Sequence, residues 1–195
     1  MTEPNYRVFI SYSHKDEVWK DRLRPHLKML EQAGLNVVTW DDRAIDAGAK
    51  WYNEIKEAME GAAVAICLIS ADFLASDFCT KEEIPYLLEQ REHKGMVLLP
   101  VLVRPCLWSA FDWLKDTQML PRDGKSVAVD FKGDEDSVFR DVAQFVSDVV
   151  KKVYRRPAPP PSRWSPPERI DTNRLPRTGA ELFGRQKELE LLDAA

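Results

Sequence analysis

Two adjacent carboxylates, Glu82 and Glu83, stand near the start of a helix predicted over 80–92. The apolar run 62–70 predicts a buried strand before it, and a short polar turn joins the two elements. Open α/β folds place their ligands at the carboxyl ends of parallel strands, which is where this turn would lie. A carboxylate in such a place can stabilise developing positive charge and accept hydrogen bonds from hydroxyl groups.

The periodicity of this helix separates the two glutamates. Its apolar face consists of Ile84, Leu87 and Leu88. The step of about 100° per residue in an α-helix puts Glu83 at the flank of that face and Glu82 nearly opposite the core. Glu83 is therefore the preferred candidate and Glu82 the alternative. Both also fit a structural role, because the helix dipole favours acidic residues in a first turn.

The elements that would position these residues alternate along the chain. Strand-like runs lie at 6–12, 37–40, 62–70, 96–103 and 126–131, and helical patterns lie at about 16–34, 51–60, 80–92 and 138–153. This alternation predicts a flavodoxin-like α/β fold, with a five-stranded parallel sheet of order 2-1-3-4-5 and helices on both faces. Pro25 removes an internal hydrogen bond, so we expect it to kink or shorten the first helix.

Charge and composition limit the partners and the compartment. The formal net charge of −4 gives no overall attraction to nucleic acid, and the apolar runs 62–70 and 96–103 are too short to span a membrane. The N-terminus shows neither a basic region nor an apolar signal segment, and the three cysteines form no disulfide pattern. We therefore expect a cytoplasmic protein that binds neither nucleic acid nor membrane.

Several other chemistries lack their motifs. The three histidines lie on different elements with no cysteine at ligand spacing, so no metal site is predicted. The sequence has no GxSxG nucleophile elbow and no GxGxxG cradle after the first strand. If the chain binds a dinucleotide at all, that dinucleotide is expected to be a consumed substrate and not a resident cofactor.

Several motifs follow one another in order along residues 5–153. They are Phe9–Ser13 with Asp16, then Trp40–Arg43 with Ile45, Gly48 and Trp51, then Leu68–Pro85, Pro100–Val101 and Leu120–Arg122. The first three resemble the first box, the BB loop, and the third strand with its following helix in Toll/interleukin-1 receptor (TIR) domains. The last two resemble features common in bacterial TIR domains.

This resemblance implies a reaction for the paired glutamates. In TIR domains that are enzymes, a glutamate at this place carries NAD⁺ cleavage, which implies an NAD⁺ nucleosidase with NAD⁺ as substrate and no cofactor. Some members space this glutamate three residues after the position of Cys79, which matches Glu82. Many bacterial members have it directly before an aliphatic residue, which matches Glu83 before Ile84. The catalytic candidate remains Glu83, with Glu82 as the alternative.

Five further residues are candidate substrate contacts, namely Ser11, Ser13, Arg43, Trp51 and Phe78. The two serines end the first strand, where a ligand crevice would open, and they also suit helix capping. Phe78 stands where enzymatic relatives often carry tryptophan, and its ring can stack on the substrate or be buried at the helix entry. Arg43 can meet a pyrophosphate or pair with nearby aspartates, and Trp51 can line the pocket or pack under the loop.

Segment 41–50 resembles the BB loop, which in the family helps to build contacts between neighbouring domains. This gives Asp42, Ile45 and Gly48 a predicted role in self-association. Two functions follow from the resemblance. One is an NAD⁺-cleaving effector of a signalling or antiphage defence receptor, activated by self-association, and the other is a non-catalytic adaptor acting through homotypic TIR–TIR contacts. The glutamate favours the enzyme, because an adaptor has no chemical need for it.

The composition changes after Tyr154. A TIR domain at 5–155 would be followed by a proline-rich linker at 156–180. Residues 181–195 include Phe183-Gly184-Arg185, which resembles the entry to STAND (NB-ARC-type) and AAA-type ATPases, with an ordinary amphipathic helix as the alternative. No GxxxxGK[ST] phosphate cradle follows, so this chain is not itself a P-loop nucleotidase. The resemblance implies the N-terminal part of a longer TIR–ATPase receptor, truncated at the start of its ATPase-like segment.

Overall fold

The computed structural model describes residues 6–41 and 51–154, and it describes only the backbone of 51–53 and 153–154. The chain divides into two units, Met1–Arg156 and Pro157–Ala195, and all described residues lie in the first. Their sheet consists of β1 (Tyr6–Ser11), β2 (Val37–Trp40), β3 (Ala62–Ile69) and β4 (Val97–Leu102). The strands are parallel and lie in the order β2-β1-β3-β4, which confirms the α/β class and the order predicted for the first four strands.

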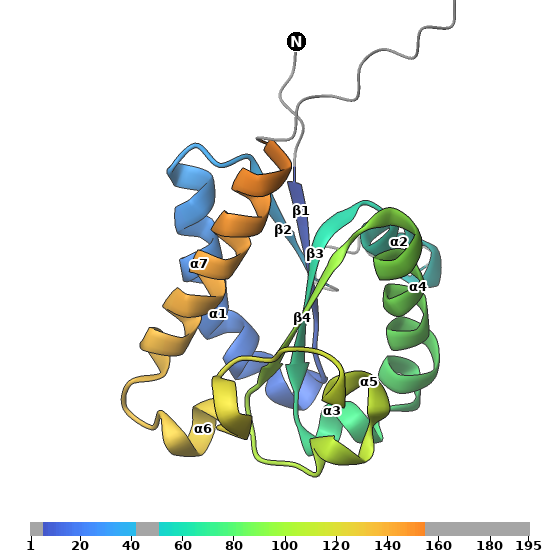
Figure 1. Ribbon diagram of the computed structural model, residues 1–195, viewed down its shortest axis with the longest axis vertical. Helices are drawn as coiled ribbons and strands as arrows, with labels where there is room; N and C mark the ends of the chain where they lie inside the picture. Colours follow the sequence, from blue (N-terminus) through green and yellow to red (C-terminus); the bar gives the residue numbers. More distant parts are fainter. Residues whose placement is uncertain (1–5, 42–50, 155–195) are drawn as a thin grey trace, which may run out of the picture. The chain divides into compact units, whose positions relative to one another are not determined.

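Helices cover both faces of this sheet, as the sequence predicts. Figure 1 shows α1 (Glu17–Gln32) and α7 (Glu135–Tyr154) on one face and α2 (Trp51–Glu60) and α4 (Ile84–Lys94) on the other. Each face carries its own hydrophobic core. The strands between them are apolar on both sides, which is typical of parallel sheets that are covered twice.

The amphipathic spacing of α1 shows how the cores form. Leu23, Leu27 and Leu30, at positions i, i+4 and i+7, are all buried. Each buried leucine stabilises the fold by about 1.5–3 kcal/mol relative to an exposed one. Pro25 lies on the exposed side of α1, where water can reach the carbonyl that has lost its partner. α1 has 16 residues in all and extends on both sides of Pro25, so the expectation that Pro25 shortens this helix is wrong.

The predicted fifth strand at 126–131 is also wrong, because these residues form the short helix α6 (Val127–Asp130). The Asp130 amide donates to the Ser126 carbonyl at 3.0 Å, and the Asp130 carboxylate accepts from the Ser126 amide at 2.7 Å. These bonds close one helical turn. Val127 is buried while Val129 is exposed, whereas a strand would point both side chains to the same face.

The connection from β4 to α6 is irregular, in keeping with its aromatic composition. It contains η4 (Trp108–Ala110), α5 (Asp112–Lys115) and η5 (Arg122–Gly124). Leu120 donates a backbone hydrogen bond to Pro100 at 3.0 Å and accepts one from Leu102 at 2.8 Å. One isolated parallel bridge therefore lies beside β4, in the place expected for the fifth strand.

Within 6–41 and 51–154, no helix combines the length and the apolar character that a membrane span requires. The elements at the carboxyl ends of the strands are short: η1 (His14–Asp16) follows β1, and α3 (Ala71–Ala75) follows β3. These short elements leave room for the site described next.

Candidate functional site at the carboxyl ends of β1 and β2

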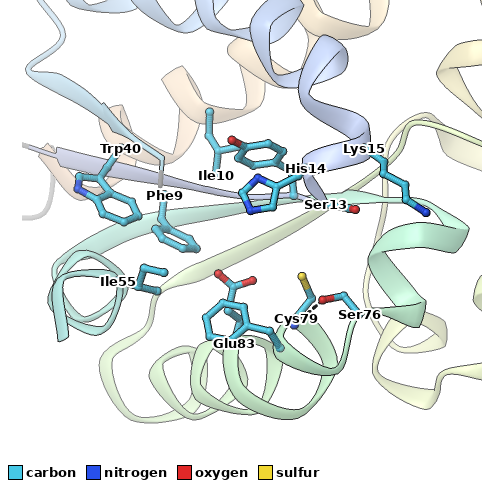
Figure 2. A pocket seen from close by; sticks show the side chains of 12 residues that line it. Phe9, Ile10, Ser13, His14, Lys15, Trp40, Ile55, Ser76, Cys79 and Glu83 are labelled. Carbon is cyan, nitrogen blue, oxygen red and sulfur yellow. Dashed lines mark hydrogen bonds between the residues drawn. The ribbon is translucent and has the colours of Figure 1, made fainter. Parts of the chain in front are cut away.

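A cavity of about 350 Å³ opens at the carboxyl ends of β1 and β2, between α2 and the turn that leads into α4. Its volume falls in the range of small-molecule sites, and its place is the one that open α/β sheets use for ligands. The lining residues are Phe9, Ile10, Tyr12, Ser13, His14, Lys15, Trp40, Ile55, Ser76, Phe78, Cys79 and Glu83 (Figure 2).

The segment that leads into α4 contains one π-helical turn, Cys79–Glu83. The Ile84 amide donates to the Cys79 carbonyl five residues earlier, so this turn is one residue wider than an α-helical turn. In this geometry Glu83 lines the cavity and is 6% exposed, whereas Glu82 faces solvent. Single π turns inside α-helices occur frequently at functional sites.

The Glu83 carboxylate is held from β1. The Ser11 hydroxyl at the end of that strand donates to Glu83 Oε2 at 2.7 Å, and both residues are buried. A short hydrogen bond to a charged acceptor restrains the orientation of the carboxylate. Figure 2 shows this carboxylate reaching from the π turn toward the sheet, with Phe9 on one side and Cys79 on the other.

Two buried thiols lie close enough to Glu83 to be affected by its charge. Burial and then the negative charge of Glu83 raise the pKa of Cys79 to about 12. The same two causes raise the pKa of Cys67, in β3, well above its ordinary value. Both thiols therefore keep their protons at neutral pH, and neither is an activated nucleophile.

An aromatic wall closes the side of the cavity nearest β2. The rings of Phe9 and Trp40 are stacked, with centroids 5.3 Å apart and planes inclined by 17°. Phe78 lines the cavity from the segment before the π turn. Flat aromatic faces of this kind can pack against planar or ring-shaped ligand groups.

The rim opposite this wall carries His14 and Lys15, both exposed. Lys15 Nζ pairs with Asp72 Oδ1 at 2.7 Å. Figure 2 shows the His14 ring above the Glu83 carboxylate and the Lys15 side chain farther out. The rim therefore carries an imidazole and an ion-paired ammonium group, and the base of the cavity holds a carboxylate.

A network of charged groups fixes the ends of β1, β3 and β4 behind this rim. The fully buried Asp16 accepts hydrogen bonds from the Ser70 hydroxyl and from Arg104 Nε, the latter at 2.7 Å. Arg104 also donates to Asp72. Hydrogen bonds to Asp16 and Asp72 raise the pKa of Arg104 above its ordinary value, and those from Lys15 and then Arg104 lower the pKa of Asp72.

The structure brings together part of the predicted substrate-contact set. Ser13 and Phe78 line the cavity. Ser11 does not line it but donates a hydrogen bond to Glu83, which does. Trp51 begins α2, but its side chain lies outside the described residues. The other candidates that lie outside them are Asp42, Arg43, Ile45 and Gly48.

Other cavity residues were not predicted as site residues from the sequence. The main ones are Phe9, His14, Lys15, Trp40, Ile55 and Cys79. Trp40 had a usable signal, because it ends a strand that pairs with β1 at the same sheet edge. Ile55 and Phe9 had none, since their apolar spacing is that of ordinary core residues. Among the described residues, no group of three or more His, Cys, Asp or Glu side chains is placed to hold a metal ion.

Two curated bacterial proteins are similar in sequence. An uncharacterized protein y4lF of Sinorhizobium fredii is 35% identical over 156 residues, which are 80% of this chain and 47% of that protein. The 2' cyclic ADP-D-ribose synthase AbTIR of Acinetobacter baumannii is 28% identical over 100 residues, which are 51% of this chain and 36% of that protein. The chain thus spans less than half the length of either relative.

Solved TIR domains are similar in structure at low sequence identity. The TIR domain of the Toll-related receptor TRR-2 from Hydra magnipapillata gives a TM-score of 0.49 at 22% identity, over 74% of this chain and 98% of that one. A chain of the RPS4 and RRS1 TIR domain heterodimer gives a TM-score of 0.49 at 16% identity, over 76% and 99%.

The match to a family model covers most of the sheet and the helices that pack on it. It extends from residue 8 in β1 to residue 144 in α7, and its description is TIR domain. The matched span includes every residue that lines the cavity. Because it also covers well over half of the 195 residues, the chain belongs to the TIR domain family.

Proposed function

We propose that this TIR domain cleaves NAD⁺ at the nicotinamide–ribose bond and that Glu83 provides the catalytic carboxylate. The observation that carries the proposal is the buried Glu83 side chain, which lines a ligand-sized cavity and is oriented by Ser11 at 2.7 Å. The Acinetobacter relative is a 2' cyclic ADP-D-ribose synthase, and the proposal gives this chain chemistry of a related kind.

The reaction makes modest demands on the protein. The bond between ribose C1' and the pyridinium nitrogen breaks, and its electron pair leaves with nicotinamide, which becomes neutral. No strong general acid is needed. The ribosyl centre becomes positively charged in an oxocarbenium-like transition state, and a fixed carboxylate beside it stabilises that charge. If water bonds to C1' and passes its proton to solvent, the product is ADP-ribose. If a hydroxyl of the same ADP-ribosyl group bonds to C1' and loses its proton, the product is a cyclic ADP-ribose.

The walls of the cavity suit the two ends of such a substrate. The faces of Phe78 and of the Phe9–Trp40 stack can pack against the nicotinamide or ribose ring. Lys15 at the rim, which pairs with Asp72, places an ammonium group where a pyrophosphate would leave the cavity. Arg43 and Trp51 remain proposed contacts, and Glu82 remains the alternative carboxylate.

We also propose that self-association controls the activity. Segment 41–50 joins Trp40 to α2, and both Trp40 and Ile55 of α2 line the cavity. A neighbouring copy bound at this segment, through Asp42, Ile45 or Gly48, would therefore act close to the substrate site.

The predicted consequence is a specific activity that falls on dilution. Nicotinamide release per mole of protein should drop severalfold between concentrated and dilute chain, because assembly is a mass-action equilibrium. Fusing the chain to an oligomerising partner should restore the dilute activity. A specific activity that is constant over the whole concentration range would contradict control by assembly.

Residues 181–195 are proposed to begin an ATPase-like segment of a longer signalling or defence receptor, after a linker at 156–180. The basis is the Phe183-Gly184-Arg185 motif described above. The reading frame downstream of Ala195 tests this directly. A GxxxxGK[ST] motif within the next few tens of codons supports the proposal, and an early stop codon rules it out.

A further inference from the structure

We propose that Cys79 is a positioning residue for the Glu83 carboxylate, holding it from the π turn while Ser11 holds it from β1. The inference rests on the proposed function of Glu83 and adds a second restraint to it. No motif of the sequence assigns this task to Cys79, which appears there only as a spacing marker.

The side chains of Cys79 and Glu83 lie on one side of the helical segment that they begin and end. Cys79 and Glu83 are the first and last residues of the turn, and both line the cavity. The residues directly before Glu83, Lys81 and Glu82, face solvent. Residues four positions apart share one face of a helix, so Cys79 and Glu83 both face the cavity while Lys81 and Glu82 do not.

The backbone of Cys79 is itself anchored. Its amide donates to the Ser76 hydroxyl at 3.3 Å, which Figure 2 shows as a dashed line. The Cys79 side chain is 4% exposed, so it has little freedom to turn away from the cavity. A donor held this firmly can orient the group it contacts.

The thiol is in the protonation state that a donor needs. Cys79 and Glu83 line the same cavity, and Figure 2 shows the thiol beside the carboxylate. Burial and then the Glu83 charge raise the pKa of Cys79 to about 12, so at neutral pH the thiol keeps its proton and can donate it to the carboxylate. Cys79 and Ser11 then restrain the carboxylate from two elements without neutralising the charge that the transition state needs.

The first test replaces the thiol in the full 195-residue chain and measures nicotinamide release. Cys79→Ala should lower kcat by about fivefold to tenfold with little change in the KM for NAD⁺, since the lost hydrogen bond is one of modest strength. Cys79→Ser keeps a donor and should recover most of kcat. Cys67→Ala is the matched control, because Cys67 is equally buried near Glu83 but does not line the cavity, and its kcat should stay near wild type.

The second test measures the contact without using catalysis. In Glu83→Gln the charge beside the thiol is gone, so iodoacetamide should label Cys79 about threefold faster or more at alkaline pH, as followed by peptide mass spectrometry. Glu82→Gln should leave this rate unchanged. The half-buried Cys106 of the same chain serves as the internal reference.

The outcomes separate the two proposals. Recovery by serine together with faster labelling in Glu83→Gln supports the positioning role. Unchanged labelling, or a Cys79→Ser variant as slow as Cys79→Ala, overturns it. If the wild type releases no nicotinamide, the proposed reaction fails, and the labelling rate alone decides whether Cys79 contacts Glu83.

Discussion

Replacing Glu83 by glutamine is expected to reduce NAD⁺ cleavage by about 10²-fold or more. Glutamine keeps the size of the side chain and can still accept a hydrogen bond from Ser11. It removes the negative charge that stabilises the ribosyl cation, and loss of one preorganised electrostatic group costs on this order. The measurement is the initial rate of nicotinamide release at saturating NAD⁺ and high protein concentration.

Glu82→Gln provides the matched control for this variant. Glu82 is the neighbouring residue of the same type in the same π turn, but it is exposed. Its replacement should leave the rate near that of wild type. If the two results are reversed, Glu82 is the catalytic carboxylate and the assignment by burial is wrong, although the mechanism remains.

The second large effect concerns stability. Asp16→Ala should lower the free energy of unfolding by about 3 kcal/mol, because breaking a buried ion pair leaves its partners unsatisfied. Asp16 is fully buried and accepts from both Ser70 and Arg104. Arg104 is about one third exposed and keeps its bond to Asp72, so the cost is placed at the lower end of the usual range. Urea unfolding followed by circular dichroism measures it.

Asp112→Ala tests whether burial, and not the ion pair itself, causes this loss. Asp112 pairs with Lys115 at 2.7 Å, the same distance as Asp16 to Arg104, but its side chain is 90% exposed. An exposed pair contributes little to stability, so this variant should unfold close to wild type. Equal losses in both variants would contradict the argument from burial.

The sequence was sufficient to predict the parallel sheet and the helices on its two faces. Their signals are local: apolar runs for the strands and leucines at helical spacing for α1. The fifth strand could not be predicted correctly, because Val127 and Val129 fit an alternating strand as well as a single helical turn. The Ser126 amide and hydroxyl donate to the Asp130 carboxylate and stabilise the helical turn. These hydrogen bonds cannot be predicted from the spacing of apolar residues.

The candidate site was predictable only where a strand end or a helix face marks it. Helical periodicity favoured Glu83 over Glu82 for the side facing the sheet, and the structure places Glu83 in the cavity. The argument from periodicity assumes a regular α-helix, however, and a π turn has no recognised signal in the sequence. Its partner Ser11 lies 72 residues earlier, and contacts over such a separation follow from the fold and not from spacing.

The most direct test of the account is the conversion of NAD⁺ by the concentrated 195-residue chain, wild type beside Glu83→Gln. We expect the wild type to release one nicotinamide for each NAD⁺ consumed, and the variant to release about 10²-fold less. Equal release by both proteins would show that the Glu83 charge is not used. No loss of NAD⁺ by the wild type, even when the chain is forcibly clustered, would contradict the enzymatic function and leave a TIR domain that acts through protein contacts.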